Sequence, residues 1–293
     1  FIASPEIVTA FSLAGRLSFN PISDKLIDSG GSKFMLVPPG EAPEVPPDGF
    51  ASGAEFYEGP PEDGSEIIIQ VNPDSERLQL IEPFPSWDGN DFVRLPVLIK
   101  TEGKTTTDHI SPAGPWLRLR GHLEKFSANM FMGAINAFTG EAGKGLNALT
   151  GERGQAISKI AWAYKAEGLR WVVVGDSNYG EGSSREHAAL SPRLLGAAAI
   201  IARGFARIHE SNLKKQGILP LVFSDPKHYE LVQETDSISL IDLDKLEAGE
   251  TVKCVLHHKD GTADVLHLNH SLSTGQIGWI KAGSALNVLH QST

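Results

Sequence analysis

Three short apolar runs in the second half of the chain constrain its fold more than any other feature. They are WVVVG within 169–176, AAAIIA at 197–202 and ILPLVF at 218–223. Each is short and apolar throughout, which is typical of a strand buried on both faces of a sheet. FARIHESNLKKQG at 205–217 lies between the second and third runs and is predicted to be a helix, with lysines in its last turn and Gly217 after it. Strands that alternate with helices in this way predict an α/β fold.

Two further elements are predicted before these runs. RLPVLIK at 94–100 is predicted to be a strand, and RGQAISKIAWAYKAEG at 153–168 is predicted to be a helix that Gly168 stops. The helix is inferred from apolar residues that recur at helical spacing, namely Ile157, Ile160, Ala161 and Tyr164. Both elements extend the α/β pattern toward the middle of the chain.

The C-terminal part contains a predicted hairpin and a predicted helix. Residues 251–270 alternate in polarity around Asp260-Gly261, which is a strong hairpin signal. Ser273 and Gln276 have the spacing of a capping box and precede an apolar helix face. That face is predicted to consist of Ile277, Ile280 and Leu286.

The N-terminal part has a different character. Ser4 is placed to cap a helix that has Pro5 at its first position and that Gly15 ends. Residues 37–76 are rich in Pro, Gly, Glu and Asp, which is typical of a surface connector, so we place the domain boundary there. The apolar face of the helix is expected to be buried and consists of Ile7, Ala10, Phe11 and Ala14. A buried helix as the first element leads us to expect a chain cut out of a longer protein.

The composition excludes several classes of protein. The formal net charge of -10 and the absence of a Lys/Arg run argue against a broad nucleic-acid or anionic-membrane surface, although a local basic pocket stays open. No apolar stretch reaches the roughly 18 residues that a membrane span needs. Cys254 is the single cysteine, which excludes an internal disulfide and is too few for an iron–sulfur cluster or a structural zinc site.

GDSNYGEGSSREHAAL at 175–190 follows a predicted buried strand and precedes a helix, which is a common position for a binding site. Glu181 replaces the lysine of a P-loop, Arg185 replaces the third glycine of a dinucleotide fingerprint, and the hydrolase elbow is absent. Two interpretations remain. Either a serine caps the helix and Arg185 lies on the surface, or Arg185 and the free helix N–H groups bind a carboxylate or oxyanion. In the second case a serine acts as a base only if positive potential stabilises its alkoxide.

TTTDHISPAGPWLRLRGH at 105–122 holds the second set of candidate residues. Asp108-His109 suggests a metal site or a catalytic pair, but adjacent residues rarely point the same way, so a structural role is favoured. Arg118 and Arg120 form either a carboxylate clamp or a solvated strand face. The remaining histidines show no metal-ligand spacing and are predicted to be structural or surface residues, while Cys254 is expected to pack in the core.

Several long motifs in these segments resemble the aconitase family, in its mitochondrial-type branch. The matching motifs are TTDHISPAG at 106–114, GEGSSREHAAL at 180–190 and FARIHESNLKKQG at 205–217, with PWLRLRGHL and IGWIKAGSALN in support. The resemblance implies a swivelling β/β/α domain at 77–293, a linker at 53–76 and, at 1–52, the end of the third, cluster-bearing α/β domain. It also implies a hydro-lyase that interconverts citrate and isocitrate through cis-aconitate in the tricarboxylic acid cycle.

The resemblance assigns roles to residues of both segments. It implies that Ser183 is the catalytic base and also contacts substrate, that Ser184 and Arg185 bind substrate, and that Arg120 is a substrate-binding arginine. The active-site Asp and Ser of DHIS fall on Asp108 and Ser111. The family's [4Fe–4S] cluster has its ligands in upstream domains, and Cys254 matches none of them. The isolated chain is therefore expected to be inactive, with no metal ligands of its own.

The remaining expectations also follow from the resemblance. The intact protein is expected to be a monomer of the mitochondrial matrix whose partners are its upstream domains, with no membrane and no nucleic acid. One alternative is an isomerase of homoaconitate or isopropylmalate. The other is a non-catalytic, aconitase-like structural or RNA-associated subunit, against which the retention of Ser183, Arg185, Asp108 and Arg120 argues.

Overall fold

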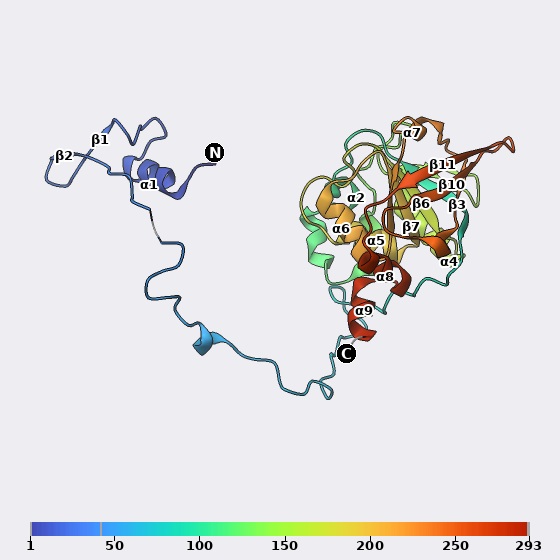
Figure 1. The fold of residues 1–293 in the computed structure, drawn as a ribbon, viewed down its shortest axis with the longest axis horizontal. Coiled ribbons are helices and arrows are strands. Elements are labelled where there is room, and N and C mark those ends of the chain that lie inside the picture. The colour runs from blue at the N-terminus through green and yellow to red at the C-terminus, as the bar shows by residue number, and fades with distance from the viewer. Residues whose placement is uncertain (1, 42, 292–293) are drawn as a thin grey trace. The chain divides into compact units, whose positions relative to one another are not determined.

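The computed structural model describes residues 2–41 and 43–291 (Figure 1). The chain divides into two compact units, Phe1–Ile68 and Ile69–Thr293, and each is described by itself. The division falls inside the segment 53–76 that is predicted to be a linker. The predicted domain boundaries themselves stay a prediction.

The first unit contains little regular structure. Helix α1 (Pro5–Ala14) begins after Ser4 and ends at Gly15, whose φ of 66° is favourable only for glycine. Strands β1 (Lys25–Ile27) and β2 (Lys33–Met35) form an antiparallel hairpin, and η1 (Ala54–Phe56) is a short 3₁₀ turn. The helix is confirmed, and the predicted face is the less exposed one: Ala10 is buried, whereas Ile7, Phe11 and Ala14 are only half-buried.

The second unit is built on a closed barrel of seven strands, in the order β10-β11-β8-β7-β6-β3-β9. The neighbours β3, β6, β7 and β8 are parallel, whereas β9, β10 and β11 complete the barrel with antiparallel pairs. The strands are β3 (Phe92–Lys100), β6 (Trp171–Gly175), β7 (Ala197–Ala202), β8 (Leu219–Phe223), β9 (Ser237–Ile241), β10 (Val252–His257) and β11 (Ala263–Asn269). The three apolar runs are thus the adjacent parallel strands β6, β7 and β8. The predicted α/β fold and the predicted hairpin are confirmed.

Two hydrophobic cores explain why β6 and β7 are apolar at every position. One core takes side chains from all seven strands, so it fills the interior of the barrel. The other lies between the outer face of β3, β6 and β7 and the helices that cover it. In β6, Val172 and Val174 belong to the first core, while Trp171 and Val173 belong to the second. Successive residues of a strand point to opposite faces, so both faces of β6 are buried.

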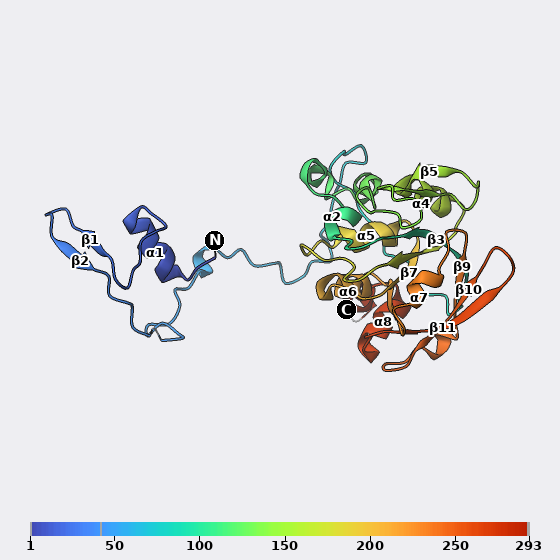
Figure 2. The same ribbon diagram turned by 90° about the horizontal axis from the view of Figure 1, so that it is seen from above.

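Helices cover the outside of the parallel strands. Helix α6 lies beside both α5 and α8, next to the barrel (Figures 1 and 2). The longer helices are α4 (Ile157–Ala166), α5 (His187–Leu194), α6 (Arg207–Lys215), α8 (Thr274–Ala282) and α9 (Ala285–Gln291); the shorter ones are α2 (Thr107–Ile110), α3 (Leu123–Phe126) and α7 (His228–Leu231). Among the described residues, no helix combines the length and the apolar character that crossing a membrane requires.

Two sequence predictions in this unit need correction. Residues Arg153–Ala156 form strand β5, paired with β4 (Lys144–Leu146), because Gly154 has a φ of 74° that a helix cannot accommodate. Helix α4 therefore begins only at Ile157. Leu286 does not belong to the buried face of α8: it lies beyond Gly283, in α9, with 71% of its surface exposed.

The capping box of α8 is confirmed. The Ser273 hydroxyl accepts the backbone N–H of Gln276 at 3.3 Å, and the Gln276 side chain accepts the backbone N–H of Ser273 at 3.1 Å. Ile277 and Ile280 are buried as predicted. The box satisfies two donors that the first turn of a helix otherwise leaves free.

Candidate functional site

The glycine loop, residues 176–186, connects the end of β6 to the start of α5. It is held against the segment that follows β3. Gly180 donates its backbone N–H to Thr105 O at 2.7 Å, and Thr107 donates its own to Glu181 O at 2.8 Å. Because β3 and β6 are parallel neighbours, their carboxyl ends meet at one edge of the barrel, which is where α/β sheets bind ligands.

The glycines of this loop are required by its geometry. Gly180 has a φ of 84°, and a Cβ there would lie 2.2 Å from the ring of His209. Gly182 has a φ of 117°, and its Cβ would lie 3.0 Å from the Thr107 hydroxyl oxygen. A positive φ is strained for residues with side chains. The GEG sequence therefore allows the loop to pass close to both α2 and α6.

Asp108 and Arg185 form the most prominent side-chain contact of the site. Both terminal nitrogens of Arg185 donate to the Asp108 carboxylate, with Nη2 to Oδ2 at 3.0 Å, and Nη1 also donates to Ser111 O at 3.2 Å. This bond to Arg185 holds the pKa of the Asp108 carboxyl below its usual value. Arg185 is thereby oriented on one edge by a bidentate carboxylate. The structure thus brings together three residues that the sequence predicts, Asp108, Ser111 and Arg185.

The two serines of the loop are presented to solvent. Ser183 and Ser184 are exposed, and neither hydroxyl makes a hydrogen bond with any of the described residues. The backbone of Ser183 is fixed, because its carbonyl accepts from the Thr107 hydroxyl at 3.1 Å and from the Arg185 N–H at 2.8 Å. The N-cap residue of α5 is Glu186, so the interpretation of a loop serine as the helix cap is wrong. Ser111, by contrast, is fully buried at the end of α2, and no described residue forms a hydrogen bond with its hydroxyl.

Arg120 lies beside the start of α5, where its carbonyl contacts His187. Residues Gly114–Leu119 form a 3₁₀ helix, so the strand-face interpretation of Arg118 and Arg120 is wrong. The Arg120 carbonyl accepts from His187 Nε2 at 2.8 Å, and the His187 ring packs against Phe126 with centroids 4.4 Å apart. The Arg120 guanidinium is exposed and forms no ion pair with a described residue.

Asp108 and His109 do not act as a pair. Asp108 faces Arg185, whereas the Nδ1 atom of His109 accepts the backbone N–H of Thr106 at 3.2 Å, within the turn of α2. The structural interpretation of His109 is therefore confirmed. Whether the predicted site residues contact a substrate stays a prediction.

A pocket of about 440 Å³ opens beside Ser183, and sequence reasoning missed part of its lining. It lies between the glycine loop, Thr107 and the first turn of α6, which contributes Arg207 and His209. His209 is buried, and neither ring nitrogen has a hydrogen-bond partner among the residues that the structure describes. Burial lowers the pKa of His209 to about 4. The available signal was its position in the first turn of a helix that follows a buried strand, since such turns face the same edge of the sheet.

No metal centre is formed by the described part of the chain. No group of three or more His, Cys, Asp or Glu residues is placed there to hold a metal ion. Cys254 is buried in β10, and burial raises the pKa of its thiol to about 12. A thiol in that state is a core residue rather than a metal ligand, as expected from the sequence.

Comparisons with known proteins agree with the motifs. Residues 95–226 match the family model of the aconitase C-terminal domain. The chain is 53% identical to the mitochondrial aconitate hydratase of Gracilaria gracilis over 287 residues, which is 98% of this chain and 37% of the relative. It is 51% identical to that of Saccharomyces cerevisiae over 98% of this chain and 37% of the relative. The chain therefore spans little more than a third of the length of these curated relatives.

A solved structure is also similar to part of the chain. A 3-isopropylmalate dehydratase (LeuD) from Methanocaldococcus jannaschii matches with a TM-score of 0.43 and 20% sequence identity. The match covers 68% of this chain and 92% of the other.

Proposed function

The chain belongs to the aconitase family, and we propose that its glycine loop takes part in the interconversion of citrate and isocitrate through cis-aconitate. The curated relatives are named mitochondrial aconitate hydratase, which is a hydro-lyase. The observation that carries the proposal is the exposed Ser183 hydroxyl, two residues from an arginine fork that Asp108 orients. Citrate has three carboxylates, and a guanidinium fork matches a carboxylate in shape and charge.

In this proposal Ser183 is the base. Dehydration breaks a C–H bond and a C–OH bond on neighbouring carbons, and the electron pair of the C–H bond forms the C=C bond of cis-aconitate. The hydroxyl group leaves with the electron pair of its C–O bond and departs as water once it has taken up a proton, so the products are cis-aconitate and water. Ser183 Oγ, as the alkoxide, takes the carbon-bound proton. A serine alkoxide is strong enough for this step when cationic groups stabilise it and water is excluded. Arg185, two residues further along the loop, contributes guanidinium N–H donors, while the Asp108 carboxylate offsets most of its net charge.

The other predicted residues are proposed to bind the substrate or to hold a substrate-binding residue in position. Arg120 and Ser184 are exposed, which supports the proposal that they contact substrate carboxylates or hydroxyls. Asp108 acts through Arg185, which it holds in one orientation, and is therefore a positioning residue rather than a reacting group. Ser111 supports the same guanidinium through its carbonyl, and its buried hydroxyl is available to a ligand only if α2 moves.

The family's [4Fe–4S] cluster has no ligands among the described residues of this chain. These residues hold no group of three candidate ligands, and the thiol of Cys254 is buried in the barrel core. The residues present do not fit the cluster. We propose that its ligands lie in other domains of the whole protein, and we assign no step to it here.

We also propose the compartment, the pathway and the partners of this reaction. The relatives' names place them in mitochondria, so we propose the mitochondrial matrix and a role in the tricarboxylic acid cycle. The partners would be the upstream aconitase domains, with the whole protein acting as a monomer.

A chimera tests the proposed function. The chain replaces the matching segment of the Saccharomyces cerevisiae relative, and the formation of cis-aconitate from citrate is followed by the ultraviolet absorbance of the new double bond. We expect turnover with citrate and isocitrate. Turnover with isopropylmalate or homoaconitate in their place would favour the alternative isomerases.

Ser183→Ala in the chimera tests the base. General base catalysis contributes about 10²–10⁴-fold, so we expect a loss of that order in kcat with citrate binding retained. Ser177→Ala is the matched control, because Ser177 is an exposed serine of the same loop that the proposal does not use. Near-normal turnover of the Ser183 variant would contradict its assignment as the base.

A further inference from the structure

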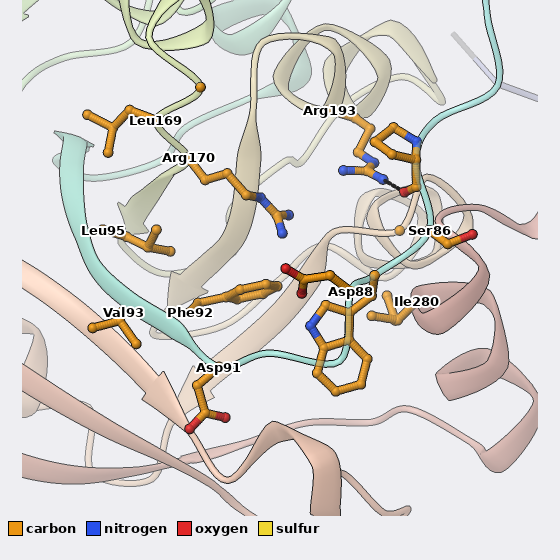
Figure 3. Close-up of a pocket in the computed structure, with 14 residues that line it drawn as sticks. Ser86, Asp88, Asp91, Phe92, Val93, Leu95, Leu169, Arg170, Arg193 and Ile280 are labelled. Atoms are coloured by element: carbon orange, nitrogen blue, oxygen red, sulfur yellow. Dashed lines mark hydrogen bonds between the residues drawn. The ribbon is translucent and has the colours of Figure 1, made fainter.

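A second polar pocket lies at the other end of the barrel, away from the glycine loop. It has a volume of about 420 Å³ and is formed by the segment that leads into β3, by Leu169 and Arg170 before β6, and by Arg193 near the end of α5 (Figure 3). The glycine loop follows the carboxyl end of β6, whereas Arg170 directly precedes its first residue. A strand rises about 3.3 Å per residue, so the length of β6 separates the two sites.

Two arginines supply the charge of this pocket. Figure 3 shows the guanidinium groups of Arg170 and Arg193 directed into the hollow from two sides. Arg193 donates through Nη2 to the carbonyls of Pro85 (2.9 Å) and Gly283 (3.3 Å). Its Nε is buried and has no hydrogen-bond partner within residues 2–41 and 43–291. Arg170 donates through Nη2 to Ala197 O at 3.3 Å, and its guanidinium lies over the ring of Phe92, 4.3 Å from the centroid.

Neither arginine forms an ion pair within the described part of the chain. Burial, and then the charge of Arg170, lower the pKa of Arg193 to about 10. Burial also lowers the pKa of Arg170. Buried charges in proteins are normally paired or bound to a ligand, because an uncompensated one is costly. Backbone carbonyls offer partial charges only, so the two cations lack a full counter-charge.

Two carboxylates line the pocket but are engaged elsewhere. Asp88 accepts the backbone N–H of Asn90 at 3.0 Å and the side-chain amide of Asn90 at 2.9 Å. Asp91 accepts the backbone N–H of Leu243 at 2.9 Å. Asp88 acts on Arg170 only at longer range, and its own side chain is exposed. It therefore opposes an incoming anion without neutralising Arg193.

We propose that this pocket is a binding site for a phosphate-class dianion, free or as a monoester, held between Arg170 and Arg193. A dianion matches the two positive charges. A tetrahedral oxyanion presents oxygens in several directions and can accept from both guanidinium groups at once. A single carboxylate has one charge and two coplanar oxygens. The inference does not rest on the activity proposed for the glycine loop.

Titration of this 293-residue chain with inorganic phosphate tests the proposal, by calorimetry at constant ionic strength and mildly alkaline pH. We expect saturable binding to the unaltered chain. Arg193→Met and Arg170→Met are each expected to raise the Kd at least about tenfold, which corresponds to 1.4 kcal/mol. Asp88→Asn is expected to lower the Kd several-fold, because it removes an opposing charge.

Arg118→Met is the matched control. It makes the same change in net charge on an exposed 3₁₀ helix and is expected to leave the Kd unchanged. Absence of phosphate binding, or equal affinity in the chain and both pocket variants, would overturn the proposal. Succinate binding as tight as phosphate would overturn the assignment to phosphate. If an arginine variant does not fold, as judged by circular dichroism, Asp88→Asn decides: an unchanged Kd contradicts the site.

Discussion

Gly180→Ala is the substitution for which the structure predicts the sharpest effect on the glycine loop. Gly180 has a φ of 84°, and a Cβ there would lie 2.2 Å, 2.3 Å and 2.5 Å from three atoms of His209. The imidazole cannot move aside easily, because His209 is 1% exposed and packs against the ring of Tyr179 with centroids 5.5 Å apart. Either the loop or the ring must shift.

The expected loss of stability has two parts. A left-handed backbone conformation costs a residue with a side chain about 1–2 kcal/mol. Forcing an additional methyl group into a packed site costs about 1–3 kcal/mol. The free energy of unfolding of the second unit should therefore fall by about 2–5 kcal/mol. For a unit of this size, each kcal/mol lowers Tm by roughly 2–4 °C.

Urea unfolding measures this loss, with Gly151→Ala as the control. Gly151 has a φ of 76°, but a Cβ there would meet no atom within 4 Å, so only the backbone part applies. The difference between the two variants isolates the clash with His209. Adding His209→Ala to Gly180→Ala should recover part of the loss, because the obstructing ring is gone. Equal losses for Gly180→Ala and Gly151→Ala would refute the reasoning.

Three further predictions concern charged and titrating groups. Asp108→Asn should change the free energy of unfolding by no more than about 1 kcal/mol, because the Asp108 carboxylate is exposed. The same substitution should raise the KM for citrate in the chimera, because Arg185 loses the partner that orients it. Burial lowers the pKa of His209 to about 4, below the value of about 6.5 that histidine has in an unfolded chain, so the unfolded chain takes up this proton first as the pH falls. The free energy of unfolding should therefore drop between those two pH values, and drop less in His209→Gln, as measured by urea titration at each pH. The ring nitrogens of His258 donate hydrogen bonds to Asp264 and Asp236, and these bonds raise the pKa of His258. Its contribution should therefore be present below the ordinary histidine pKa and disappear at higher pH, so His258→Gln should lower Tm more at pH 6 than at pH 8.

The parallel strands of the barrel could be predicted from the sequence because the signal for them is local. A strand such as β7 is buried on both faces, and each of its residues, Ala197–Ala202, is apolar for that reason. The capping box at Ser273 and the turn at Asp260-Gly261 are also local, since the interacting atoms lie within a few residues of each other. Patterns of this kind do not depend on what the rest of the chain does.

The closure of the barrel could not be predicted in the same way. It depends on β11 pairing with β8 and on β9 pairing with both β3 and β10, and these are long-range contacts. The error at 153–156 has a local cause instead: apolar spacing indicated a helix, but Gly154 adopts a left-handed conformation and the segment pairs with β4. The exposed position of Leu286 follows from the break at Gly283.

In the candidate site, too, local features could be predicted from the sequence and long-range contacts could not. The loop and its serines could be located from the sequence, because glycines after a buried strand mark a ligand-binding turn. The pairing of Asp108 with Arg185 could not, since the two residues are 77 positions apart and meet only because β3 and β6 are neighbours. His209 was missed because a single histidine in a helix has no distinguishing pattern. Its contact with Gly180 exists only in three dimensions.

The two arginine sites of the second unit differ in how their charge is compensated, and this difference bears on what each can bind. Arg185 already has a carboxylate partner, so it is well oriented but offers a ligand little net charge. Any substrate selectivity it gives must come from geometry, and additional positive charge must come from a group such as the exposed Arg120. Arg170 and Arg193 have the opposite balance: they are held by carbonyls and an aromatic ring and retain their full charge. An anion there would be attracted mainly by charge, so its affinity should fall steeply with salt concentration, whereas ligand binding at Arg185 should depend on salt much less.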